Sequence, residues 1–205
     1  MSEKWATIPD EKTIKETVDC LRNRGIIVIV VGTRTEAMEK LKEIIPRGVE
    51  VMTGSSTTLD QIGFKDYLKS GKHGWKSLND EIMRENDDFK RLDMRRKSVT
   101  AEYFLGSVNA ISRDGELVAC DKTGSRTGAY LYAAKNLVLV AGVQKITQNT
   151  HEALVRVKDY VFPLEDARSK KAYGIPSATN KWIIIEGEVV KNRITLILVK
   201  DKLGF

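Results

Sequence analysis

Apolar residues recur first at helical spacing and then in continuous runs along the first quarter of the chain, which predicts helices and strands in alternation. Residues 10–24 carry an apolar residue at every third or fourth position, so we expect a helix that ends at Gly25. Residues 26–31 are six branched aliphatics without a polar face, a run typical of a central strand covered on both sides. A second helix is expected to begin at Thr33, and a second strand to cover 49–53.

The same two patterns continue to the end of the chain. The expected helices are one beginning at Thr58 and others over 77–97, 100–108, 129–135 and 149–162, with Pro163 ending the last and a loop over 166–180. In the 77–97 helix, which Asn86-Asp87-Asp88 weakens, the residues expected to face inward are Leu78, Ile82, Met83, Phe89, Leu92 and Met94. The expected strands are 109–112, 116–120, 137–141, 182–185 and 194–199. These elements predict a single α/β domain over residues 1–205, a mostly parallel sheet flanked by helices, with the helix 10–24 packed on it.

One glycine-rich loop follows a predicted hairpin. Asp114-Gly115 separates two short β-favouring runs, because glycine accepts the positive φ that a tight turn needs. The loop over 121–128 reads DKTGSRTG, and a helical run and a buried strand over 137–141 follow it. A polar loop between a strand and a helix is where α/β sheets hold ligands, and the start of the helix offers donors to an anion.

A second polar loop follows the strand 49–53. Gly54 permits a sharp exit from that strand, and Thr58 with Gln61 has the spacing of a capping pair. Ser55, Ser56, Thr57 and Thr58 are four consecutive hydroxyl residues, although one is enough to cap a helix. The loop is therefore either a pocket for phosphate or carboxylate or an ordinary turn from strand to helix.

Composition and charge narrow the classes of protein. No apolar run approaches the ~20 residues that cross a bilayer, and the first twelve residues have no apolar leader, so we expect a cytoplasmic protein without a membrane partner. Cys20 and Cys120 fit a reducing compartment, and neither they nor His73 and His151 form a metal motif, so no metal site of Cys and His is expected, whereas one built on carboxylates stays open. The net charge is +6, with a basic run over 90–97, but no aromatic platform accompanies it, so nucleic acid is not the expected partner.

The two loops together predict an anion site. Hydroxyl and N–H groups would hold the charged end of a metabolite, with Lys122 or Arg126 as the neutralising cation. Arg126 either grips a carboxylate with two hydrogen bonds or lies at the surface, and Lys122 would act as a point charge. Asn109 either lines the site or caps the helix expected before it. The predicted ligand-binding residues are Thr53, Gly54, Ser55, Ser56, Thr57, Asn109, Lys122, Thr123, Gly124, Ser125 and Arg126.

Two acidic residues are candidate catalytic groups. Asp121 is a candidate general base if burial raises its pKa, or it bonds only the backbone of its own turn. Glu102 is a second candidate acid, or a solvated residue of an amphipathic helix.

Four segments together resemble the LUD-domain family, which includes the lactate-utilization protein C and YkgG-type proteins. They are VNAISRDGELVACDKTGSRTGAYLYAAKNLVLVAGVQKI, TGSSTTLDQIGF, EALVRVKDYVFPLEDAR and ITLILVKDKLGF. The resemblance implies a fold related to ribose-5-phosphate isomerase, glucosamine-6-phosphate deaminase and the CoA transferases. In those sugar-phosphate enzymes a loop similar to Thr53-Gly54-Ser55 binds phosphate.

The same resemblance implies a part in the oxidation of lactate to pyruvate beside iron–sulfur subunits. Some relatives carry a cysteine-rich segment where this chain reads AYGIPSATNKW over 172–182, without cysteine. We therefore expect no iron–sulfur cluster within this chain, and its cofactor stays open.

Three functions follow as hypotheses. The chain is a component of lactate or organic-acid utilization that binds a small anionic metabolite, with a homo-oligomer and iron–sulfur oxidoreductase subunits as candidate partners. It is alternatively a non-catalytic anion-binding or assembly subunit. A sugar-phosphate isomerase-like enzyme is the third, for which Asp60 is the base nearest in sequence; a CoA transferase ranks low because neither loop contains a glutamate nucleophile.

Overall fold

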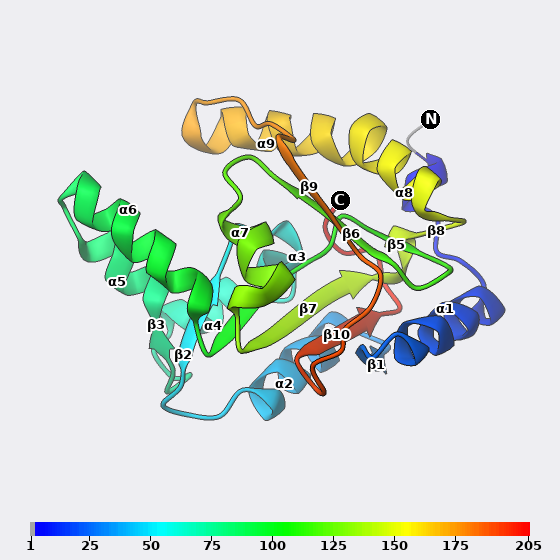
Figure 1. The fold of residues 1–205 in the computed structure, drawn as a ribbon, viewed down its shortest axis with the longest axis horizontal. Helices are drawn as coiled ribbons and strands as arrows, with labels where there is room; N and C mark the ends of the chain where they lie inside the picture. The colour runs from blue at the N-terminus through cyan, green and yellow to red at the C-terminus, as the bar shows by residue number, and fades with distance from the viewer. Residues whose placement is uncertain (1–2) are drawn as a thin grey trace.

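The computed structural model describes residues 3–205, which form two sheets with helices around them (Figure 1). The larger sheet has six strands in the order β1-β10-β7-β4-β2-β3, and every neighbouring pair is parallel. Its strands are β1 (Ile27–Val31), β10 (Ile194–Val199), β7 (Asn136–Gly142), β4 (Tyr103–Gly106), β2 (Glu50–Thr53) and β3 (Lys76–Ser77). The predicted α/β class with a mostly parallel, helix-flanked sheet is confirmed.

The core lies on both faces of this sheet, and β7 shows why. Successive side chains of a strand point to opposite faces, and every second residue of β7 enters a different cluster. Leu137 and Leu139 pack with residues of α1 (Glu11–Asn23), whereas Val138 and Val140 pack with residues of α2 (Arg34–Ile44). A strand that is buried on both faces has no polar side, which explains the unbroken apolar runs in the sequence.

The aliphatic run at residues 26–31 is not a central strand, and that prediction is wrong. It forms β1, which lies at one edge of the larger sheet, and Ile27 and Val30 are each 37% exposed. An apolar run indicates that the faces of a strand are covered, but it does not reveal how many hydrogen-bonded neighbours the strand has. The two strands in the middle of the sheet are β7 and β4 instead.

The smaller sheet contains the predicted hairpin. Its strands follow the order β8-β5-β6-β9, and Gly115 turns the chain from β5 to β6 with φ +95°. The strand bounds are β5 (Ala110–Ser112), β6 (Leu117–Asp121), β8 (Ile146–Thr147) and β9 (Lys181–Ile185). The helical stretch of α8 (Thr150–Arg156) and α9 (Phe162–Tyr173) lies over this sheet (Figure 1).

Two helix predictions in the middle of the chain need correction. Residues 100–108 do not form a helix: after a short turn they form β4, which pairs with β2 and β7 in the sheet interior. Pairing on both sides outweighs the local helical preference of this segment. Residues 77–97 form two helices, α5 (Leu78–Arg84) and α6 (Asp88–Lys97), because Asp87 caps the second one by accepting from the backbone N–H groups of Phe89 and Lys90.

The side chains of this helix pair are also more exposed than predicted. Of the six residues expected to face inward, Ile82 is buried, whereas Met83, Phe89 and Leu92 are exposed. No residue of α6 is buried, because the pair projects from the end of the larger sheet next to β3 (Figure 1).

Pro163 does not end the helix that precedes it. α8 (Thr150–Arg156) continues through a π-helical turn over 157–161 into α9 (Phe162–Tyr173), which ends at Gly174. Proline is tolerated in the first turn of a helix because its missing N–H is not needed there. The loop predicted over 166–180 is therefore helical as far as Tyr173.

The remaining helices are α3 (Thr57–Gln61), α4 (Phe64–Lys69) and α7 (Ser125–Gly128), with a π-helical turn over 129–133 after α7 and short 3₁₀ turns at Glu3–Ala6, Ser98–Thr100 and Val143–Lys145. Within residues 3–205, no helix combines the length and the apolar character that crossing a bilayer requires.

The parallel order positions the site. β2, β4 and β7 are adjacent, and their carboxyl ends lie at the same edge of the sheet. The segments that leave this edge, 54–58, 107–109 and 143–145, are therefore brought side by side, although they are far apart in the sequence.

Candidate functional site

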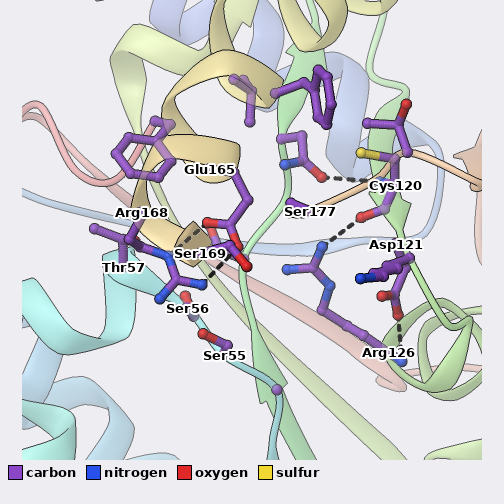
Figure 2. A pocket seen from close by; sticks show the side chains of 18 of the residues that line it. Ser55, Ser56, Thr57, Cys120, Asp121, Arg126, Glu165, Arg168, Ser169 and Ser177 are labelled. Carbon is purple, nitrogen blue, oxygen red and sulfur yellow. Dashed lines mark hydrogen bonds and ion pairs between the residues drawn. The ribbon is translucent and has the colours of Figure 1, made fainter. Parts of the chain in front are cut away.

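The two polar loops line one cavity of about 370 Å³ at the carboxyl edge of the larger sheet. Residues of the loop after β2 lie on one side, and Asp121 and Arg126 of the loop after β6 lie on the other (Figure 2). The loops also touch: a Cβ placed on Gly54 would lie 3.3 Å from Cδ of Arg126. The predicted residues that line the cavity are Gly54, Ser55, Ser56, Thr57, Asn109, Asp121, Lys122, Thr123, Ser125 and Arg126.

Three predicted residues do not line the cavity. Thr53 donates its hydroxyl to the Gly54 carbonyl, and Gly124 supplies the left-handed backbone (φ +95°) that starts α7. Glu102 precedes β4, so it lies at the amino end of the strands, and it forms an ion pair with Lys135 at 3.4 Å. The geometry therefore separates Glu102 from the two loops.

In the loop after β2, the expected capping pair is replaced by other contacts. Ser56 caps α3, because its Oγ accepts from the Leu59 N–H at 3.3 Å. Thr58 is buried, and its hydroxyl contacts Lys145 at 3.1 Å instead of capping a helix. The hydroxyls of Ser55 and Thr57 belong to the cavity wall and have no capping role.

In the loop after β6, Asp121 holds the backbone. Its two carboxylate oxygens accept from the N–H groups of Thr123 (3.3 Å) and Arg126 (2.9 Å). These contacts agree with the second interpretation of Asp121, in which it bonds its own turn. The Arg126 guanidinium donates to the Cys120 carbonyl at 2.5 Å, and Lys122 Nζ donates to the Pro176 carbonyl at 2.8 Å.

Asn109 lines the cavity and fastens the hairpin. Its side-chain oxygen accepts from the Cys120 N–H at 3.0 Å across the two strands. The helix that it was expected to cap does not exist, because β4 occupies that segment. Burial raises the pKa of the neighbouring Cys120 thiol to about 11, so the thiol is protonated at neutral pH.

Helix α9 forms a wall that the sequence did not predict. Arg168 forms a two-pronged ion pair with Glu165, with contacts of 2.6 and 2.7 Å, and both side chains face the cavity (Figure 2). Hydrogen bonds with Arg168 and then with Ser55 lower the pKa of Tyr173, so this tyrosine links α9 to the loop after β2. A loop was expected over 166–173, whereas the helix there places Glu165, Arg168 and Ser169 together at the cavity.

Lys145 is the second feature that the sequence did not predict. It ends the 3₁₀ turn after β7, is only 3% exposed and lines the cavity. Its Nζ contacts Thr58 Oγ1 at 3.1 Å, Ser107 Oγ at 3.0 Å and the Val108 carbonyl at 3.0 Å. Burial, reinforced by the charges of Arg156 and Arg126, lowers its pKa well below the ordinary value of 10.5. A lysine within the short turn after a buried strand was the available signal.

Positive charge predominates in the cavity. Five basic and two acidic side chains line it, the basic ones being Arg95, Lys122, Arg126, Lys145 and Arg168 and the acidic ones Asp121 and Glu165. Arg168 pairs with Glu165, whereas the other four basic side chains have no acidic side chain of the described residues within ion-pair distance. No cluster of three or more His, Cys, Asp or Glu residues in this part of the chain could hold a metal ion.

Comparisons with known proteins identify the fold. The family model of the LUD domain matches residues 14–199. The crystal structure of a DUF162 family protein from Deinococcus radiodurans superposes with a TM-score of 0.54 at 15% identity, over 92% of this chain and 96% of that one. eIF2B beta from Chaetomium thermophilum gives a TM-score of 0.33 at 15% identity, over 67% of this chain and 43% of that one, too low to support an argument. None of the curated proteins matches the chain.

Proposed function

The chain belongs to the LUD-domain family, and on that premise we propose that its cavity binds a small anionic metabolite, a carboxylate or a phosphate, between the two glycine loops. The charge imbalance of the cavity is the observation that carries this proposal. Arg126 is half-buried and shares the cavity with two exposed cations, Arg95 and Lys122. None of the three has an acidic side chain of the described residues within ion-pair distance, and taking a charge out of water without compensation is costly. An anion that enters the cavity supplies the missing charge.

The contacts of Arg126 and Lys122 support separate roles. The Arg126 guanidinium donates one hydrogen bond to the Cys120 carbonyl, and its other N–H groups are left as donors for a carboxylate. Lys122 is exposed and bonds a neutral carbonyl, so it adds a point charge at the entrance. The hydroxyls of Ser55 in one loop and of Thr123 and Ser125 in the other also line the cavity and provide neutral donors.

In the same proposal the chain is a component of lactate or organic-acid utilization, as its family suggests. Iron–sulfur oxidoreductase subunits and a second copy of the chain are its proposed partners. Asp121 then acts as a positioning residue, because its bonds to the backbone keep the loop after β6 in place. The isomerase-like alternative has less support, since Asp60 is exposed and outside the cavity lining.

A thermal-shift series tests the binding. Lactate, pyruvate, inorganic phosphate and a sugar phosphate are each added to the wild-type chain and to Arg126→Gln and Thr123→Ala. We expect at least one acid to raise the Tm of the wild type and both variants to lose most of that rise. Arg96→Gln is the matched control, because Arg96 is exposed on α6 outside the cavity. A Tm that no acid changes would contradict the proposal.

Turnover separates the catalytic hypothesis from the assembly hypothesis. The purified chain is assayed with lactate and an artificial electron acceptor, without partners. Turnover that Arg126→Gln removes supports a catalytic component. Binding without turnover supports an anion-binding subunit that needs its partners.

A further inference from the structure

We infer that Lys145 is a nucleophilic amine that forms a reversible imine with the carbonyl carbon of a small oxo acid held in the cavity. This inference rests on the proposed function, because the carboxylate of the oxo acid must first be bound between the two loops. It names the class of ligand more narrowly: an acid that carries a ketone or aldehyde group beside its carboxylate.

The position of Lys145 is the first argument. The two segments that leave the neighbouring strands β2 and β4 converge on its Nζ, which contacts the hydroxyls of Thr58 and Ser107 and the carbonyl of Val108 at 3.0–3.1 Å. A lysine side chain is long and flexible in water, but here it is buried and held at the cavity wall. Fixing a reactive amine beside a bound carbonyl removes much of the entropic cost of the reaction.

The charges around Lys145 are the second argument. No carboxylate within residues 3–205 lies within ion-pair distance of its Nζ, and Asp60 on the neighbouring helix α3 is exposed. The charged groups that act on it are the guanidiniums of Arg156 and Arg126, which oppose a further positive charge. With the burial, they favour the neutral amine, which is the form that attacks carbonyl groups.

The hydrogen bonds of Lys145 can be made by the neutral form as well as by the charged one. A neutral amine has two protons and one lone pair, so it can donate to the Val108 carbonyl and to the Ser107 hydroxyl and accept from the Thr58 hydroxyl. The Ser107 hydroxyl in turn donates to the Val108 carbonyl at 3.3 Å. Both hydroxyls also stand where protons must move when the amine reacts.

The reaction balances without a further reagent. The nitrogen lone pair forms a C–N bond to the carbonyl carbon, the π pair moves to oxygen, and that oxygen takes the proton which the nitrogen gives up. The nitrogen lone pair then expels the hydroxyl group, which takes a proton from the medium and leaves as water. The product is a protonated imine, so the positive charge that burial disfavoured appears next to the bound carboxylate.

Reductive trapping tests the inference on the wild-type chain. The protein is incubated near neutral pH with pyruvate and cyanoborohydride, and the modified lysines are mapped by peptide mass spectrometry. We expect the adduct at Lys145 to form several-fold faster than at exposed lysines, because a lowered pKa leaves more of the amine in the neutral, nucleophilic form. Lactate, which has a hydroxyl group in place of the carbonyl, should suppress the adduct by competition and form none itself.

Lys122 is the internal control, because it lines the same cavity but is exposed. Labelling of Lys122 and surface lysines with Lys145 unmodified, while pyruvate still raises the Tm, would overturn the inference and leave the proposed function standing. Absence of any Tm rise with either acid would overturn the proposed function itself. Arg126→Gln should lower the rate of labelling at Lys145, since the inference requires the carboxylate to be held.

Discussion

Lys145 and Arg156 lie eleven positions apart and are both buried, yet their surroundings differ. Each donates to a backbone carbonyl of the same segment. Lys145 donates to the Val108 carbonyl at 3.0 Å, and Arg156 donates to the Asn109 carbonyl at 2.5 Å. Arg156 also donates to the Trp5 carbonyl, and its guanidinium lies over the Tyr160 ring. It does not line the cavity, whereas Lys145 does.

This difference shows how a buried cation without an acidic partner is to be interpreted. Neither residue has a carboxylate of the described chain within ion-pair distance. Arg156 is enclosed by groups that it holds together, so its role is structural. Lys145 has the same burial beside an open space, where a ligand can reach it. The cavity, and not the charge or the burial, distinguishes the two roles.

Replacement of Arg156 should have the largest effect on stability. Arg156→Met leaves the carbonyls of Asn109 and Trp5 buried without a donor, at about 1–3 kcal/mol for each unsatisfied group. We expect the free energy of unfolding to fall by about 3 kcal/mol in urea denaturation. Arg96→Gln on the exposed face of α6 is the control and should change it by less than ~0.5 kcal/mol. Equal stability of Arg156→Met and the wild type would contradict the structural role.

Replacement of Lys145 should cost less stability and change its pH dependence. The pKa of Lys145 is lowered in the folded state, so the unfolded chain binds more protons at every pH between that lowered pKa and 10.5. In that window the unfolding free energy of the wild type therefore rises with pH, and Lys145→Met lacks this rise. We expect the unfolding free energy of Lys145→Met to be about 1–2 kcal/mol below that of the wild type near neutral pH, and the difference to be larger at higher pH. Urea denaturation at several pH values measures it.

A difference between wild type and Lys145→Met that shrinks as pH increases would show that the folded state holds the lysine charged. That result would also remove the basis for its nucleophilic role.

Replacement of Lys122 should have the smallest effect on stability. This lysine is exposed and bonds the Pro176 carbonyl, so Lys122→Met should change the unfolding free energy by less than ~0.5 kcal/mol. Its loss should weaken anion binding severalfold, and more at low than at high salt, because exposed charges are screened. Calorimetric titration with pyruvate at two salt concentrations measures this. A loss of unfolding free energy as large as that of Arg156→Met would contradict this and would mean that Lys122 holds the segment over 174–180 in place.

The sequence predicted the strands and loops that local chemistry determines. The hairpin at Asp114-Gly115 and the strand β7 appear as expected, because a positive φ and an unbroken apolar run have few alternatives. The polar loops at 53–58 and 121–128 also appear as expected, and residues of both line one cavity. Their composition is unusual enough to be seen without any knowledge of the fold.

The sequence could not predict what depends on pairing between distant segments. β4 resembles a helix locally, and its neighbours β2 and β7 decide its conformation. The edge position of β1 follows from strand order, which apolar patterning does not encode. Lys145 and the Glu165–Arg168 pair become part of the site only because adjacent strands and helix α9 bring them to the loops.

A crystal structure of the chain grown with saturating pyruvate tests the central claim most directly. We expect density for one acid in the cavity, with its carboxylate on Arg126 and its carbonyl carbon next to Nζ of Lys145. Well-ordered pyruvate at another surface, with the cavity between the two glycine loops free of any anion, would contradict the account.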